Sequence, residues 1–312
     1  MNQKTLAALA AAGLALVACS DPTRTPTGIL APTGPSDAVS TNPVTGGQLH
    51  GAPEHRFFAK GQPGRKRSVN MTFHGGTILV ANKTQAIFWG PSWTPYTGDI
   101  ITGLDSFFSG FGVSNYANAS TEYTGTNGQV TSSSTYLGHY IDGTPAPTNA
   151  LSVTGAVAEA CKVTNNAPVP DALYLIYTET GAGNVNYCAW HSYGNCSNGA
   201  PLQVAYMPNI TGLAGCDPLD TYGTGHSEGL AALANVTAHE LSETITDPRH
   251  GGWYDASGAE NGDKCAWAFY GPVTFPRNQT LWKLQMEWSN NAYTAGTGYP
   301  NTSGQNGCLQ GQ

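Results

Sequence analysis

Residues 227–248 read SEGLAALANVTAHELSETITDP, and this stretch predicts a long helix with a core-facing side and a polar side. Ser227 is a suitable N-cap, and Pro248 ends the helix because it biases the residue before it away from the helical region. The core-facing stripe recurs with helical spacing at Leu230, Leu233, Ala234, Thr237, Leu241, Thr244 and Ile245. His239 and Glu243 fall roughly opposite this stripe, so we expect the helix to form the floor of a cleft.

The spacing of His239, Glu240 and Glu243 on this helix predicts a metal site. An imidazole and a carboxylate one helical turn apart, as at His239 and Glu243, can reach a single cation. Glu240 is placed to act as general base on a water molecule at the ion. The pattern resembles the H-E-x-x-H helix of zinc peptidases, with Glu243 where the second histidine would be. The alternative is a solvated acidic helix face that carries a chance histidine.

The following segment, residues 252–267 (GWYDASGAENGDKCAW), supplies candidates for a third ligand. Helical zinc sites usually take that ligand from further along the chain and leave one position open. Glu260 and Asp263 are the candidates, and the sequence does not choose between them. Loop carboxylates also commonly stabilise turns, so either residue has an ordinary structural explanation.

The run HELSETITDP followed by GWYDASGAENGDKC resembles bacterial members of the phosphate-induced protein 1 (EXORDIUM) family. The similarity extends to FHGGTILVANKTQAIFWG from Phe73 and to residues 171–209, and covers roughly residues 70–309. The resemblance implies an extracellular protein, since plant members are extracellular and growth-associated. It supplies no reaction, because the family has no established chemistry and many members lack the His-Glu pair.

The N-terminus predicts export and lipid anchoring. Residues 1–18 carry Lys4 and an apolar run from Leu6 to Leu16. This run is shorter than a membrane-spanning helix requires and is typical of a signal peptide. The run ends in LVAC, which resembles a lipobox in which Cys19 becomes the lipidated first residue. We therefore expect an exported protein anchored at the outer membrane or cell surface; an ordinary signal peptide is the alternative.

Composition divides the rest of the chain into a predicted linker and a predicted folded domain. Residues 19–68 are rich in Pro, Thr, Gly and Ser and predict a disordered linker, whereas residues 69–312 suffice for a single folded domain. Charged residues are only 11%, and the net charge of −7 argues against nucleic acid or an anionic membrane surface as partner. We expect a peptide or cell-surface substrate instead.

Hydrophobic patterning predicts an α/β or α+β domain with a mixed sheet and flanking helices. Strands are expected at Phe73–Val80, Gln85–Trp89, Ala172–Thr178 and Leu202–Met207, with further helices over 100–111 and 152–163. Residues 112–147 are expected to be irregular, with a hairpin over the cleft. A sheet followed by a metal-bearing helix is similar to the zincin arrangement.

The cysteines predict disulfides. After Cys19, six remain in an exported chain: Cys161, Cys188, Cys196, Cys216, Cys265 and Cys308. We favour Cys265–Cys308, with Cys188 and Cys196 bridged to each other or to Cys161 and Cys216. A zinc site of four thiolates is disfavoured because no C-x-x-C pair is present.

These residues together predict a zinc-dependent hydrolase, most simply of peptide bonds. His239 and Glu243 would be ligands and Glu240 the base, and His191, in a cysteine-containing loop, would contact substrate unless it is structural. GHSEG at Gly225 lacks a preceding strand, which disfavours a serine hydrolase. The competing hypothesis is a non-catalytic surface or adhesion module with a structural ion or none. An open coordination position in a cleft would distinguish the two.

Overall fold

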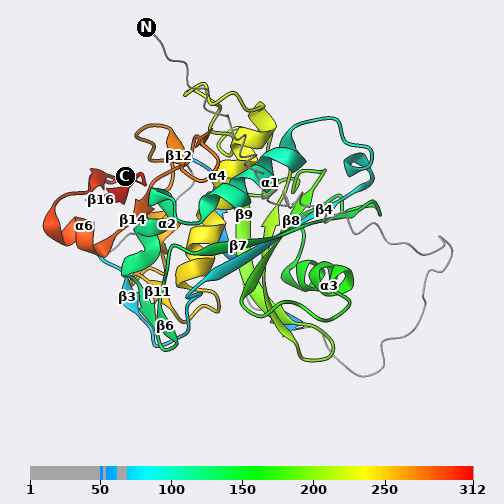
Figure 1. Ribbon diagram of the computed structural model, residues 1–312, viewed down its shortest axis with the longest axis horizontal. Coiled ribbons are helices and arrows are strands. Elements are labelled where there is room, and N and C mark those ends of the chain that lie inside the picture. Colours follow the sequence, from blue (N-terminus) through cyan, green and yellow to red (C-terminus); the bar gives the residue numbers. More distant parts are fainter. Residues whose placement is uncertain (1–49, 52–53, 62–68, 312) are drawn as a thin grey trace, which may run out of the picture.

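The computed structural model describes residues 50–51, 54–61 and 69–311, and its centre is a seven-stranded mixed sheet (Figure 1). The strands are β1 (His50–Gly51), β2 (His55–Phe58), β4 (Asn82–Trp89), β7 (Ser134–Asp142), β8 (Ala172–Thr178), β9 (Tyr187–Asn195) and β10 (Pro201–Met207). Their order is β1-β9-β10-β8-β4-β7, and β2 also pairs with β9. The four strands β7, β4, β8 and β10 run parallel, whereas β9 is antiparallel to β10 and to β1 and β2. The predicted mixed sheet is confirmed.

Helices cover both faces of this sheet. Alternation along β8 divides its side chains: Leu173 and Leu175 belong to a core shared with α1 (Ile100–Phe111) and α4 (Glu228–Thr246), while Tyr174 and Ile176 belong to a second core shared with α3 (Val153–Val163). Figure 1 shows α3 on one side of the sheet and α1 with α4 on the other. The predicted helices and their arrangement as flanking layers are confirmed.

The long helix α4 begins and ends where the sequence predicts. Ser227 Oγ accepts the backbone N–H of Leu230 at 3.2 Å, and the last helical residue is Thr246, two before Pro248. The expected open polar side is wrong, however, because every residue from Gly229 to Thr246 is buried. The helix packs against β9, β10 and β2 on one side and against α5 (Asn261–Lys264) on the other, so it is enclosed all round.

Smaller elements fill out the remainder of the domain. They are β3 (Thr72–Phe73), η1 (Pro91–Trp93), α2 (Asn115–Asn118), η2 (Ala119–Glu122), β5 (Thr124–Gly125), β6 (Gly128–Gln129), β11 (Trp253–Tyr254), β12 (Val273–Phe275), β13 (Thr280–Trp282), β14 (Glu287–Trp288), α6 (Asn290–Ala295), β15 (Tyr299–Pro300) and β16 (Asn306–Leu309). β12 pairs with β13, and β14, β16 and β15 form a three-stranded sheet. These segments bring Gln285 and α5 against the C-terminal half of α4.

Two predicted elements differ from the structure. The strand expected at Phe73–Val80 is present only as β3, because Gly75 adopts a φ of +90° and Gly76 hydrogen-bonds to the loop after α4, donating to Gly251 O at 2.6 Å. Within 112–147, expected to be irregular, β7 forms a nine-residue strand parallel to β4. Its side chains are mostly half-buried at the sheet edge, so the strand lacks the continuous apolar run that would have predicted it.

Three disulfides tie these layers together. Cys265–Cys308 is confirmed, and the open alternatives resolve to Cys161–Cys196 and Cys188–Cys216. The last two anchor both ends of β9, one to α3 and one to the loop before α4.

The folded part begins before Val69, within the segment predicted to be a linker. β2 pairs with β9, and its Phe57 is fully buried in the core beneath α4, so this segment is not a linker throughout. Residues 1–49, which include Cys19, lie outside the described residues, and the signal peptide and lipid anchor stay predictions. Among the described residues, no helix is long and apolar enough to cross a membrane.

Candidate metal centre

Histidines and carboxylates from five segments converge beneath β9 and β2. They are His55 from β2, His191 from β9, His239, Glu240 and Glu243 from α4, Asp247 and His250 from the turn after α4, and Glu260 and Asp263 at α5. His239, Glu240, Glu243, Asp247, Glu260 and His191 are at most 1% exposed. His55, His250 and Asp263 are half-buried; the side chains of His55 and Asp263 are 17% and 22% exposed.

The structure brings the predicted helix residues together into an inner set of His239, Glu240 and Glu243. One donor atom from each lies within 4.8 Å of the others. His239 Nε2 is 3.0 Å from Glu243 Oε1 and 3.9 Å from Asp263 Oδ1. The helical spacing therefore brings donor atoms of one histidine and two carboxylates together, and that they bind a metal stays a prediction.

The ring of His239 is held tightly on every side. Phe57 stacks on it with ring centroids 3.8 Å apart, and Gln285 Nε2 lies 2.9 Å from His239 Nδ1 and also 2.9 Å from Gly262 O. In this amide orientation Nδ1 accepts, so Nε2 carries the proton of the neutral ring. For Nε2 to ligate a cation, the amide of Gln285 must turn and present its oxygen to Nδ1.

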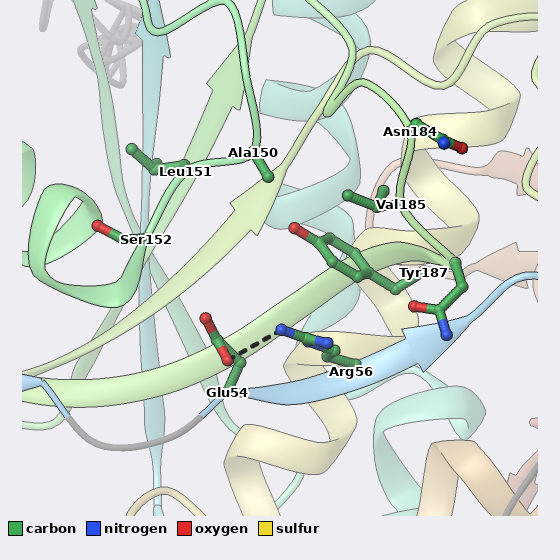
Figure 2. A pocket seen from close by; sticks show the side chains of 9 residues that line it. Glu54, Arg56, Ala150, Leu151, Ser152, Asn184, Val185 and Tyr187 are labelled. Carbon is green, nitrogen blue, oxygen red and sulfur yellow. Dashed lines mark hydrogen bonds and ion pairs between the residues drawn. The ribbon is translucent and has the colours of Figure 1, made fainter.

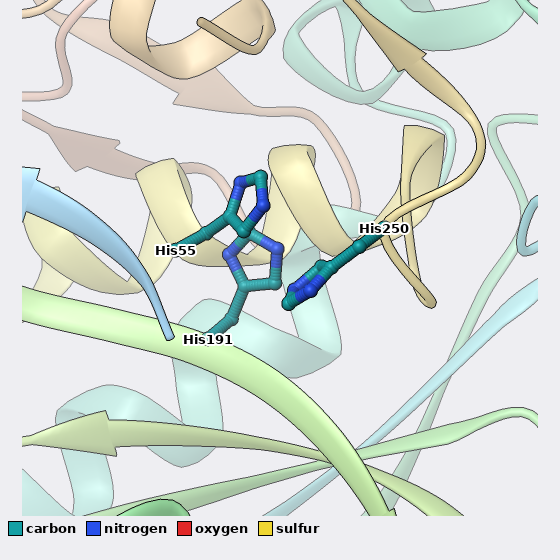
Figure 3. A group of neighbouring side chains, drawn as sticks. All are labelled: His55, His191 and His250. Carbon is teal, nitrogen blue, oxygen red and sulfur yellow. The ribbon is translucent and has the colours of Figure 1, made fainter. Parts of the chain in front are cut away.

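A second, outer set comprises His55, His191 and His250, with Glu260 beside it. Figure 3 shows the three rings gathered from three different segments. Ring centroids are 4.0 Å apart for His55 and His250, 5.4 Å for His55 and His191, and 5.9 Å for His191 and His250. Glu260 Oε2 lies 2.9 Å from His55 Nδ1 and 3.6 Å from His191 Nε2.

The two candidates for a third ligand lie on different sides of the cluster. Asp263 approaches His239 in the inner set, whereas Glu260 approaches His55 and His191 in the outer set. Glu243 lies between them, because it belongs to one group with His239 and Glu240 and to another with His191 and Glu260. The geometry thus separates two residues that the sequence could not rank.

His191 does not lie in a loop as predicted, but on β9. Its neighbour Ala189 belongs to the core beneath α4, and two-residue alternation places His191 on that same face. His191 Nδ1 lies 3.0 Å from Glu240 Oε2. The residue therefore contacts the predicted base, a relation that needed the strand register to be known.

Sequence reasoning missed His55 and His250. His55 lies in a polar segment with no periodicity, yet β2 pairs it directly with His191 on β9. His250 follows the Asp-Pro that ends α4, and the turn brings it to within 4.0 Å of His55, measured between ring centroids. The position of His250 just after the proposed metal helix is the one feature of the sequence that could have indicated its role.

The cluster contains buried carboxylates without a lysine or arginine partner among the described residues. Among the described residues, no lysine or arginine forms an ion pair with Glu240, Glu243, Asp247 or Glu260. Glu240 Oε1 is buried without a hydrogen bond among the described atoms, and Glu260 Oε2 faces imidazole nitrogens, at 2.9 Å from His55 Nδ1 and 3.6 Å from His191 Nε2. Such a group costs about 1–3 kcal/mol when left unsatisfied, and more when charged. A bound cation would satisfy these oxygens together.

Burial and mutual repulsion shift the acid–base equilibria in the outer part of the cluster. Burial lowers the pKa of His191 well below its usual value, and charges on His55 and His250 add to this. The pKa of His250 falls to about 3 through burial and the proximity of His55. Burial raises the pKa of Glu260 well above its usual value, with Glu243 contributing. The two imidazoles are therefore neutral, the form in which they bind metals.

Charge pairing shifts the pKa values of the inner-set residues in different directions. Burial lowers the pKa of His239, but Glu243 and Asp263 raise it above its usual value overall. Burial raises the pKa of Glu243, yet contact with His239 brings it below its usual value. Burial raises the pKa of Glu240 well above its usual value, with Glu243 and Asp263 adding to the effect. Glu243 is thus the anionic member and Glu240 the one that holds a proton readily.

Solvent approaches the cluster through a small pocket. The pocket has a volume of about 190 Å³ and is lined by Glu54, His55, Arg56, Phe58 and Asp263. A larger pocket of about 610 Å³ lies across β2 and contains no member of the cluster. Figure 2 shows Arg56 in that pocket, paired with Glu54 at 3.3 Å and beside the ring of Tyr187. The smaller pocket is therefore the one that adjoins the histidine–carboxylate cluster, although the other pocket has the larger volume.

No family model, curated protein or solved structure matches this chain. The resemblance to the phosphate-induced protein 1 family therefore stays a prediction carried by the quoted motifs. Functional reasoning rests on the buried cluster itself.

Proposed function

We propose that this protein is an exported zinc-dependent hydrolase of peptide bonds, with a zincin-like helix at its centre. The observation that carries the proposal is the buried histidine–carboxylate cluster centred on α4, in which no lysine or arginine among the described residues forms an ion pair with Glu240, Glu243, Asp247 or Glu260. A lipid anchor at Cys19 and a peptide or cell-surface substrate complete the proposal.

In this proposal, His239 and Glu243 hold the ion, and Asp263 or Glu260 is the third ligand. When bound, Zn²⁺ supplies Lewis acidity and lowers the pKa of a water molecule. Phe57 and Gly262 keep the ring of His239 in place, since Phe57 stacks on its face and Gly262 leaves room for its edge. Asp263, the partly exposed member, lies where the small pocket would admit a substrate.

Glu240 is the proposed general base. Its Oε2 lies 3.0 Å from His191 Nδ1, while its Oε1 is buried without a hydrogen bond among the described atoms. One oxygen is therefore held in position and the other remains able to accept a proton. Burial raises the pKa of this carboxyl well above its usual value, with Glu243 and Asp263 contributing, so it takes up a proton more readily than an exposed glutamate does.

The second candidate is a non-catalytic surface or adhesion module in which the cluster binds a structural ion. Near-complete burial of the inner set favours it, because closed sites are typical of structural zinc and open ones of catalytic zinc. Zinc content alone does not separate the two candidates, so the test needs a reaction.

The test compares His239→Ala and Glu240→Gln with the unmodified protein. His239→Ala should lose the zinc ion that His239 and Glu243 hold, because carboxylates alone make a poor zinc site. Glu240→Gln should keep zinc and lose cleavage of a mixed peptide library, since the amide oxygen can still accept from His191 but cannot take up a proton. Glu228→Gln, at the exposed start of the same helix, is the matched control and should retain both. Zinc without cleavage in the unmodified protein would favour the structural ion.

A further inference from the structure

The outer set has the composition and geometry of a metal site in its own right. His55, His191 and His250 each offer a nitrogen, and these nitrogens lie within 4.8 Å of one another. Tetrahedral zinc, with Zn–N distances of about 2.0–2.1 Å, separates its nitrogens by roughly 3.4 Å. Each nitrogen would therefore need to move by less than about 1 Å, which rotation of an imidazole provides.

Two of the three rings direct an unsatisfied atom into the site. His191 Nε2 and His250 Nε2 are buried without a hydrogen bond among the described atoms. His191 Nδ1 lies 3.0 Å from Glu240 Oε2, and donation to this carboxylate leaves the lone pair on Nε2. A carboxylate behind an imidazole in this way is the usual support of a metal-binding histidine.

The backbone is built to hold these rings together. His55 and His191 are direct cross-strand partners in the β2–β9 pair, which brings their side chains to one face. His250 adopts a left-handed φ of +55°, a conformation that costs energy for a residue with a side chain. Asp247 Oδ1 supports that turn by accepting the backbone N–H groups of Gly251 and Gly252, each at 2.6 Å.

We propose that His55, His191 and His250 bind a second zinc ion, with Glu260 as its fourth ligand. Glu260 Oε2 is 2.9 Å from His55 Nδ1 and 3.6 Å from His191 Nε2, so it faces the same space as the imidazoles. This site leaves Asp263 as the third ligand of the inner ion. Glu243 belongs to donor groups on both sides and lies between the two ions. The inference concerns binding alone and stands whether or not the protein is a hydrolase.

The experiment measures bound zinc per chain by elemental analysis of the full-length exported protein, equilibrated with Zn²⁺ and desalted. The unmodified protein should hold two zinc ions and His250→Asn one, with the affinity for the second ion reduced at least about tenfold. Asparagine is chosen because it tolerates the left-handed conformation, so the turn is preserved while the imidazole is lost. His74→Ala, on an exposed ring stacked against Tyr254, is the matched control and should retain two ions.

A second variant tests the outer zinc site independently of the proposed hydrolase activity. His239→Asn should remove the inner ion and retain the outer one, so it too should hold one zinc. No zinc in the unmodified protein, or as many ions in His250→Asn as in the unmodified protein, would overturn the proposal. Absence of peptide cleavage by the unmodified protein with two ions bound would count against the proposed function and leave the outer site standing.

Discussion

Gly262 offers a selective way to perturb the inner set without touching a ligand. A Cβ at this position would lie 2.9 Å from His239 Nδ1, 3.0 Å from Glu243 Oε1 and 3.1 Å from His239 Cε1. Gly262 lies in α5 and has no left-handed φ, so the backbone itself accepts alanine. The site alone therefore requires glycine here, and Gly262→Ala tests whether the site binds metal.

The size of the effect follows from these distances. Ordinary contact begins at 3.4 Å, so His239 Nδ1 must retreat by 3.4 − 2.9 = 0.5 Å. That movement exceeds the tolerance of roughly 0.2 Å in zinc–ligand distances, and we expect zinc affinity to fall about 10–100-fold. Folding itself should change less, because about 1–3 kcal/mol of overpacking is partly offset by about 0.4–1 kcal/mol from replacing glycine.

The assay is thermal unfolding with and without zinc. At a zinc concentration 100 times the dissociation constant, binding stabilises the unmodified protein by about 2.7 kcal/mol. A site weakened about 100-fold gains only about 0.4 kcal/mol at the same concentration. The difference of about 2.3 kcal/mol should make the zinc-induced rise in Tm about 5–9 °C smaller for Gly262→Ala in a domain of this size.

Gly271→Ala is the control for this experiment. A Cβ there meets no atom within 4 Å, so the zinc-induced shift should be unchanged. An unchanged zinc shift in Gly262→Ala as well would refute the reasoning, because the ion would then not depend on the position of His239 or Glu243. Loss of the shift in both variants would point to a general effect on folding.

Three further predictions concern other parts of the chain. Burial and the neighbouring Asp142 raise the pKa of Glu159 to about 8, so the stability that its bound proton contributes should be complete at acidic pH and be lost as the pH rises to about 8. Glu159→Gln should therefore make the free energy of unfolding less dependent on pH across that window. Replacing Cys161 and Cys196 by serine should lower the free energy of unfolding by about 2–4 kcal/mol in denaturant titrations. Cys19→Ser should move the protein from the membrane to the soluble fraction on cell fractionation; continued membrane association would contradict the lipobox interpretation.

Much of the fold follows from local patterns. The buried strand β8, the amphipathic helix α1 and the capped helix α4 each carry a strong periodic or capping signal, and all three are confirmed. β7 and β2 lack such signals, because one is a polar edge strand and the other a four-residue strand in a Pro-rich segment. Their pairing with β4 and β9 is non-local, so it depends on contacts that no window of sequence contains.

The site divides in the same way. His239, Glu240 and Glu243 lie on one helix, and helical geometry alone predicts that they meet. His55 and His191 meet because of a register between two strands, which the sequence could not specify. The expected cleft was wrong for a related reason: the segment that covers α4 includes Phe57, which the composition had assigned to a linker.

Glu240 links the inner set, which helical spacing brings together, to the outer set, which depends on strand pairing. Helical spacing predicts it as a base beside the inner ion, while the structure adds a contact between its Oε2 and His191 Nδ1. The two roles use different oxygens, so they are compatible, and both require the carboxylate to remain in place. A base needs an oxygen that can take a proton, whereas a support for His191 needs only an acceptor. Glutamine supplies the acceptor without the base, so Glu240→Gln should abolish cleavage and leave both ions bound.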